Sequence, residues 1–202
     1  MSARLFEDDV VFYQRFLKSA GLYTGLIDGI WGPLTGAADA AFIAASETAA
    51  EELGRFDPRT EGHIATLQVS AQQAARASIA RIKSAGFQVK IISGTRSFAE
   101  QNELFKKGRF GNPGPKVTNA RGGFSNHNFG IAWDIGLFDG GEYLTSSQPY
   151  EETALAGKAD ELVWGGDWQS FKDTPHYQLK TDLSISQVRE RFEEGLPYFP
   201  TV

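Results

Sequence analysis

The spacing of apolar residues predicts two helices in the first sixty residues. The first begins after Asp9, a residue type that caps helices, and ends near Ala20. Its apolar face is expected to consist of Val10, Tyr13, Phe16 and Leu17. The second helix begins at Pro33, is rich in alanine and runs to about Ala50. Glycine, aspartate and proline within residues 53–60 predict a linker.

A longer apolar stripe follows, and it predicts one helix over residues 62–84. Its buried positions are expected to be Ile64, Leu67, Ala71, Ala75, Ile79 and Ile82. Residues 87–93 are rich in β-branched side chains and predict a strand, whereas residues 97–107 have a helical pattern. The glycine- and proline-rich run 109–123 predicts a long irregular loop, and such loops are usually functional or disordered.

Two short strands complete the expected fold, one at residues 129–135 and one at the edge of the sheet at residues 177–179. The pattern therefore predicts a domain of helices and short strands over residues 61–202. Residues 1–60 are expected to form a small all-α module with its linker in front of that domain.

Composition narrows the possible chemistry. The chain has 202 residues, is 41% hydrophobic and carries a formal net charge of −5. This length is sufficient for a sizeable core. The lack of cysteine excludes thiolate metal sites, thiol nucleophiles and disulfides. An acidic balance without a basic run argues against nucleic acid as a partner.

The sequence lacks the patterns of a membrane span and of a secretory signal. No apolar stretch approaches the roughly 20 residues that cross a bilayer. The first residues do not combine a basic region with a following apolar region. We therefore expect a protein that is made in the cytoplasm and does not insert into membranes. A monomer is expected.

Two of the three histidines lie in glycine-rich segments together with carboxylates. His127, Asp134 and His176 offer two imidazoles and one carboxylate, a set that suits zinc with a fourth position left for water. Because seven residues separate His127 from Asp134, His127 must lie in the loop before the strand. Asp173 is the candidate general base, with Asp167 as its rival. The spacing alone also allows these side chains to lie in solvated loops.

Three stretches carry a more specific signal, namely SGTRSFAEQNELF, KVTNARGGFSNHNFGIAWD and WGGDWQSFKDTPHYQL. Together they resemble the L-alanyl-D-glutamate endopeptidases of the zinc D-Ala-D-Ala metallopeptidase superfamily. These are cell-wall peptidases of phage endolysins and bacterial autolysins, and they share a core with hedgehog domains. The resemblance covers about residues 64–179 and implies an α+β fold, in which helices flank a small antiparallel sheet.

The resemblance also implies a role for each matching residue. One zinc ion would be held by His127, Asp134 and His176, with Asp173 as the catalytic base. Arg96 matches the arginine that binds the substrate and the developing oxyanion.

Residues further along the implied cleft match less closely. Gln101 and Ser125 fall at positions implied to contact substrate. Relatives more often have Tyr where Asn126 and Phe129 stand, and this difference bears on fine substrate preference.

The activity implied is zinc-dependent hydrolysis of the L-Ala–D-Glu bond in peptidoglycan stem peptides, in the service of cell lysis. The run Asp173-Thr174-Pro175-His176 favours this branch over the D-Ala-D-Ala carboxypeptidases, which remain an alternative. A non-catalytic wall-binding protein is the other alternative. An enzyme of this kind would reach periplasmic peptidoglycan after holin-type release or dedicated secretion.

Residues 10–42 have a resemblance of their own, to the core repeat of a small helical peptidoglycan-binding domain. Its informative part is the run LYTGLIDGIWGPLT. The resemblance implies wall binding, whereas the alternative is a common helical pattern in which Trp31 belongs to the core. Elsewhere, His63 is expected at the surface or as a cap. Packing is expected for Trp133, Trp164 and Trp168, with the alternative that either Trp164 or Trp168 lines the cleft.

Overall fold

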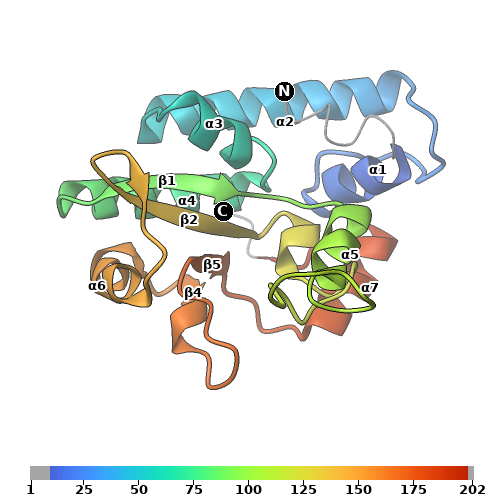
Figure 1. Cartoon of the computed structure of the whole chain (residues 1–202). Helices are drawn as coiled ribbons and strands as arrows, with labels where there is room; N and C mark the ends of the chain where they lie inside the picture. The colour runs from blue at the N-terminus through green and yellow to red at the C-terminus, as the bar shows by residue number, and fades with distance from the viewer. Residues whose placement is uncertain (1–9, 200–202) are drawn as a thin grey trace.

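A small antiparallel sheet lies in the middle of the molecule with helices around it (Figure 1). The structure is a computed structural model, in which residues 10–199 are described. The helices are α1 (Val10–Ser19), α2 (Pro33–Leu53), α3 (Pro58–Ile64), α4 (Val69–Ser84), α5 (Phe98–Lys106), α6 (Ser147–Gly157) and α7 (Ile185–Glu194), with 3₁₀ turns η2 (Asn126–Phe129) and η3 (Gly165–Asp167). The strands are β1 (Gln88–Ser93), β2 (Ala132–Asp139), β3 (Glu142–Tyr143), β4 (Leu162–Trp164) and β5 (His176–Leu179). The α+β class predicted from the sequence is confirmed.

The sheet has the order β1-β2-β5-β4, with β3 paired to the far end of β2. The prediction that residues 177–179 form an edge strand is wrong, because β5 lies between β2 and β4. β4 has only three residues, too few for a periodic pattern to reveal it. The register places Asp134 on β2 directly opposite His176 on β5.

The strand expected at residues 129–135 begins three residues later, at Ala132. Residues 126–129 form the 3₁₀ turn η2, which ends at Gly130 with φ +71°. A Cβ atom at Gly130 would lie 2.5 Å from a ring carbon of Phe16 on α1, so only glycine fits here. Phe129 is buried, but it packs in the core as part of a turn and not as part of a strand.

The single helix expected over residues 62–84 is in fact two helices, α3 and α4. Thr66 lies in the break, where its hydroxyl donates to the carbonyl of His63 and accepts from the amide of Thr95. The carbonyl of Thr66 accepts from the hydroxyl of the distant Thr95, in place of a helical backbone amide. The apolar stripe passes through the break unchanged, because all six of its residues are buried. Periodicity alone therefore cannot reveal the interruption.

The connection between α2 and α3 is shorter than expected. α3 begins at Pro58, capped by the side chain of Asp57, so the irregular linker comprises only residues 54–57. The two helices predicted before it are confirmed as α1 and α2. The proposed capping residue of the first, Asp9, lies outside the described residues.

The N-terminal helices pack into the same hydrophobic core as the sheet. α2 lies along α4, and α1 contacts α7 near the C-terminus (Figure 1). The side-chain amide of Gln68 donates to the carbonyl of Phe16 and to the hydroxyl of Tyr198, each at 3.1 Å. Tyr198 in turn donates to the carbonyl of Phe129. The core is thus continuous across residue 60, while the division into two functional modules stays a prediction.

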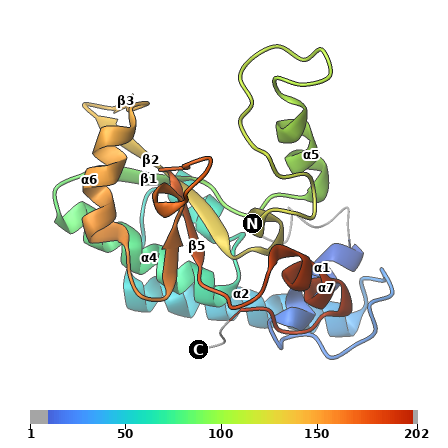
Figure 2. The same ribbon diagram turned by 90° about the horizontal axis from the view of Figure 1, so that it is seen from below.

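The long loop after α5 projects from the body of the molecule (Figure 2). Residues 109–123 contain no helix or strand, as the glycine and proline content predicted. Within residues 10–199, no helix is both long and apolar enough to cross a membrane.

Candidate active site

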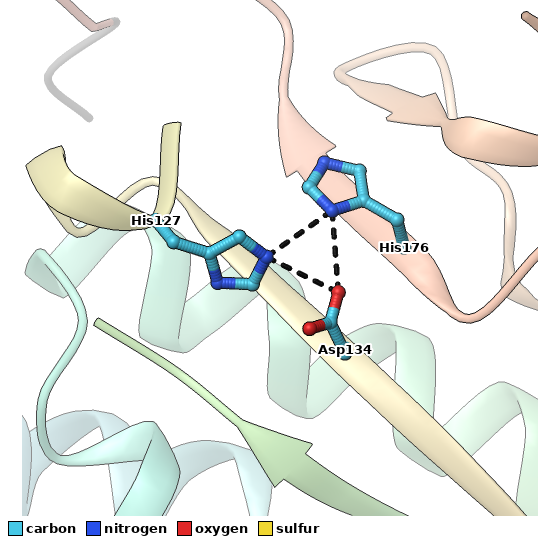
Figure 3. A group of neighbouring side chains, drawn as sticks. All are labelled: His127, Asp134 and His176. Carbon is cyan, nitrogen blue, oxygen red and sulfur yellow. Dashed lines mark hydrogen bonds and ion pairs between the residues drawn. The ribbon is translucent and has the colours of Figure 1, made fainter. Parts of the chain in front are cut away.

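Three candidate ligand side chains meet where η2 and strands β2 and β5 come together (Figure 3). His127 projects from η2, ahead of β2, and reaches back over the strand that carries Asp134. Its Nε2 lies 3.1 Å from Oδ1 of Asp134 and 3.2 Å from Nδ1 of His176. The third side, between His176 Nδ1 and Asp134 Oδ1, is 3.2 Å. The two histidines are 2% and 5% exposed.

Hydrogen bonds on the outer side of each imidazole determine which nitrogen carries the proton. Nδ1 of His127 lies 2.8 Å from the carbonyl oxygen of Gly94, which only accepts, so Nδ1 is the donor. Nε2 of His176 lies 2.9 Å from Oε1 of Gln178 and donates to it. The nitrogens that face Asp134 therefore present lone pairs, and three electron-rich atoms meet at one point.

This arrangement fits a metal ion. Tetrahedral zinc with nitrogen and oxygen ligands at about 2.0–2.1 Å separates neighbouring ligand atoms by roughly 3.3–3.4 Å. The three observed separations of 3.1–3.2 Å are close to that value. Burial alone would lower the pKa of His176, but the hydrogen bond and charge of Asp134 outweigh it and raise that pKa. Asp134 therefore favours positive charge beside His176, and the three residues could hold a metal ion.

Arg96 is paired with the other oxygen of the same carboxylate. Its Nη2 forms an ion pair with Oδ2 of Asp134, and its Nε donates to Ser93 Oγ at 3.0 Å. Burial opposes ionisation of Asp134, but the two imidazoles and the guanidinium hold its pKa well below the ordinary range. Arg96 thus adds to the effect of the imidazoles on Asp134 and, by pairing with Oδ2, leaves Oδ1 facing the two histidines. Binding of substrate by Arg96 stays a prediction.

Gln101 does not occupy the place expected of a substrate contact. Its side chain is fully buried, and Oε1 accepts a hydrogen bond from Arg96 at 3.3 Å. Its amide nitrogen donates to Thr118 Oγ1 and to the carbonyl of Ala120. Through these hydrogen bonds Gln101 connects the loop after α5 to Arg96. Its side chain has no exposed surface with which to contact substrate.

A cleft of about 620 Å³ lies over the three ligands. One wall is the end of the long loop, residues 117–120, and another is the segment 168–175. Of the residues predicted for the site, the cleft is lined by Arg96, Ser125, His127, Asp134, Asp173 and His176. Gln101 does not line the cleft and lies behind Arg96.

The two candidate bases lie in different surroundings. Asp173 is half-buried in the cleft wall, where burial and the negative charge of Asp134 raise its pKa. A hydrogen bond from the amide of His176 to the carbonyl of Asp173 closes a tight turn between them. Asp167 is exposed, pairs with Lys158 and does not line the cleft. The geometry favours Asp173 as the group beside the metal.

The predictions for the remaining aromatic and histidine residues have mixed outcomes. Trp133 and Trp164 are buried as expected, and the indole of Trp164 donates to the carbonyl of Thr174 in the cleft wall. For Trp168 the alternative to packing holds, because it lines the cleft with its ring 4.9 Å from that of His176. His63 is half-buried in the last turn of α3.

The comparisons with known proteins agree with this geometry. A family model described as D-alanyl-D-alanine carboxypeptidase matches residues 118–179, which carry all three candidate ligands. The peptidoglycan L-alanyl-D-glutamate endopeptidase CwlK of Bacillus subtilis (strain 168) is 38% identical over 120 residues, covering 54% of this chain and 70% of CwlK.

A solved structure shares the fold. The crystal structure of the Serratia marcescens L-Ala D-Glu endopeptidase ChiX matches with a TM-score of 0.50 and 24% identity, over 64% of this chain and 92% of that one. At 24% identity this match indicates a shared fold only. Family membership follows from the likeness to CwlK in identity and coverage: the chain belongs to the family of peptidoglycan L-alanyl-D-glutamate endopeptidases.

Proposed function

We propose that this protein is a zinc-dependent endopeptidase that hydrolyses the L-Ala–D-Glu bond of peptidoglycan stem peptides. The observation that carries the proposal is the meeting of three lone pairs, from His127, Asp134 and His176, at tetrahedral separation in a cleft. A zinc ion held there would polarise the scissile carbonyl and lower the pKa of a bound water to about 7. Family membership supplies the substrate class.

The side chains around the metal have separate tasks in this proposal. Asp173 accepts a proton from the attacking water and passes it to the leaving amine, since it is the carboxylate in the cleft that binds no metal. Arg96 holds Asp134 through Oδ2 and, as a cleft residue, also offers its charge to the oxyanion of the substrate. Ser125 is proposed as a further substrate contact at the cleft wall.

Replacement of Asp173 by alanine tests the assignment of the base. We expect Asp173→Ala to bind one zinc ion as the parent does, while the rate of peptidoglycan hydrolysis falls about 10²–10⁴-fold, the usual contribution of general acid–base catalysis. Metal content by atomic absorption and turnover of a soluble muropeptide measure the two effects. Asp167→Ala is the matched control and should keep the parent rate. Near-normal turnover in Asp173→Ala would assign the base elsewhere.

A D-alanyl-D-alanine carboxypeptidase is the second candidate, because the family model that matches residues 118–179 has that description. Both reactions need the same metal and base, so variants of the site do not distinguish them. The two differ in product: the carboxypeptidase releases free D-alanine, whereas the endopeptidase exposes a new D-glutamate amino terminus.

We also propose that the N-terminal helical segment binds peptidoglycan through an exposed apolar patch. The patch consists of Leu26, Ile30, Trp31 and Leu34, which are between 43% and 79% exposed. The fully buried side chain of Gln14 holds the turn beneath it, donating to Asp28 Oδ1 and accepting from the amide of Gly29. Several exposed apolar side chains within nine residues of a fixed turn are consistent with an interaction site.

Co-sedimentation with purified peptidoglycan tests the patch. The variant Ile30→Ser/Leu34→Ser should sediment less than the parent when EDTA blocks hydrolysis. Leu155→Ser is the control, because Leu155 is 91% exposed on α6, away from the patch. Equal sedimentation of the three proteins would contradict wall binding by this patch.

Because peptidoglycan lies outside the inner membrane, we further propose that the protein reaches it by holin-type release or dedicated secretion, as a lytic enzyme. Lysis of an expressing culture only when a membrane pore is co-expressed would support this route, and lysis without a pore would contradict it.

A further inference from the structure

Gln178 lies beside the metal site although no sequence motif singled it out. It follows His176 by two residues on β5, and side chains two apart on a strand project from the same face. Tyr177 and Leu179 occupy the opposite face and are buried in the core. Gln178 therefore lines the cleft with His176, and its Oε1 lies 2.9 Å from the outer imidazole nitrogen, Nε2.

A second side chain holds Gln178 from the other wall. Asn126, next to His127 on η2, donates from Nδ2 to the same Oε1 atom at 2.9 Å. Gln178 Oε1 thus accepts one hydrogen bond from each of the two segments that carry the histidine ligands. The other end of the Asn126 amide, Oδ1, is buried without a hydrogen-bond partner. An unpaired buried oxygen is unfavourable, so the bond that Nδ2 makes is the only one that this side-chain amide has among the described residues.

We infer that Asn126 and Gln178 are positioning residues that hold His176 in the tautomer protonated at Nε2. In that tautomer the lone pair of Nδ1 points at Asp134 and His127, where the metal would bind. The inference rests on the proposed metal site. His127 is held in the same sense by the carbonyl of Gly94, and Asp134 by Arg96. The Asn126–Gln178 pair gives the third ligand its outer partner.

Without this pair, the outer nitrogen of His176 would lose its fixed acceptor. Either tautomer would then form, and only one of them offers Nδ1 to a metal. Loss of an outer partner of a metal ligand typically weakens metal affinity or activity about 10–100-fold. Trp168, whose ring lies 4.9 Å from that of His176, contacts the imidazole but provides no acceptor for Nε2.

Zinc affinity of the full chain, measured by competition with a chelator, tests the inference apart from activity. We expect Gln178→Leu to raise the zinc Kd about 10–100-fold. Gln178→Glu keeps an acceptor oxygen and should restore affinity to at least the parent value. Asn126→Leu should also raise the Kd, because it removes the donor that fixes Oε1. Gln148→Leu, on the exposed surface of α6, is the matched control and should not change it.

Imidazole ¹⁵N chemical shifts of the metal-free protein provide a second readout. The parent and Gln178→Glu should show His176 protonated at Nε2, and Gln178→Leu a mixture of tautomers. Equal zinc affinity and equal tautomer in Gln178→Leu and the parent would overturn the inference. So would loss of turnover at unchanged zinc affinity, because Gln178 would then act on the substrate.

Two further outcomes are possible, namely a variant that does not fold and a parent that binds no zinc. If Gln178→Leu does not fold, Gln178→Glu and Asn126→Leu carry the same comparison, and unchanged affinity in Asn126→Leu contradicts the paired role. If the parent itself binds no zinc, the proposed function fails and the inference fails with it. If the parent binds zinc tightly and the variants bind it equally tightly, the inference about Asn126 and Gln178 is wrong while the proposed function stands.

Discussion

His127→Ala is expected to abolish zinc binding and to lower peptidoglycan hydrolysis at least about 10²–10³-fold. A metal that polarises a carbonyl contributes several kcal/mol of transition-state stabilisation, and each ~1.4 kcal/mol corresponds to a factor of ten in rate. His127 is almost fully buried and provides one of the three candidate ligand atoms, which all lie within 4.8 Å of one another. A water molecule in place of the imidazole would be a ligand without a fixed position.

Metal content and turnover, measured on the same preparation, check this expectation. His63→Ala is the control, since His63 lies on α3 outside the ligand set, and this variant should retain both zinc and rate. Chelation of the parent should lower the rate as His127→Ala does, and added zinc should restore the parent alone. Full turnover in His127→Ala would show that the three side chains do not form the catalytic metal site.

Phe16→Ala is expected to lower the free energy of unfolding by about 3–5 kcal/mol, the usual cost of removing a buried phenylalanine. Phe16 is fully buried on α1, its ring lies 5.5 Å from that of Phe42 on α2, and it packs against Gly130 behind η2. The cavity would therefore open directly behind the turn that carries His127. We expect zinc affinity to fall along with stability.

Urea unfolding followed by circular dichroism measures the loss of stability. Leu34→Ala is a suitable control because Leu34 is exposed on α2, and surface changes usually stay within about 0.5 kcal/mol. The same reasoning predicts that residues 61–202 alone do not fold, since the core they share with α1 and α2 would be open. Cooperative unfolding of that fragment would contradict a shared core.

The sequence predicts the fold class because each long element has its own local signal. Ser97 and Glu100 form the capping box at the start of α5, and β1 has a run of β-branched residues. Two features without a local signal are predicted wrongly. The break between α3 and α4 depends on contacts of Thr66 with the distant Thr95, and the interior position of β5 depends on pairing with the three-residue β4.

In the candidate site too, residues with a local sequence signal are predicted and long-range contacts are not. His127, Asp134, His176 and Asp173 stand in long motifs, and the structure brings them to one cleft. Two of the contacts that hold them join segments far apart in the chain, so sequence patterns do not reveal these contacts. Gly94 precedes His127 by 33 residues, and Asn126 and Gln178 are 52 apart.

Gln101 is a residue whose motif position predicts the wrong contact. Its place in the motif predicts a substrate contact, and only the fold shows that the side chain is buried against Arg96. The signal that could have revealed Gln178 is its two-residue spacing from His176 on a strand, which places both side chains on one face.

The identity of the bond that is cleaved tests the central claim most directly. Purified peptidoglycan is digested with the zinc-loaded protein, and the soluble products are analysed by mass spectrometry after labelling of new amino termini. The proposed function predicts peptides that begin with D-glutamate, together with L-alanine left on the glycan. Release of free D-alanine without a new D-glutamate amino terminus would contradict it and establish the carboxypeptidase reaction instead.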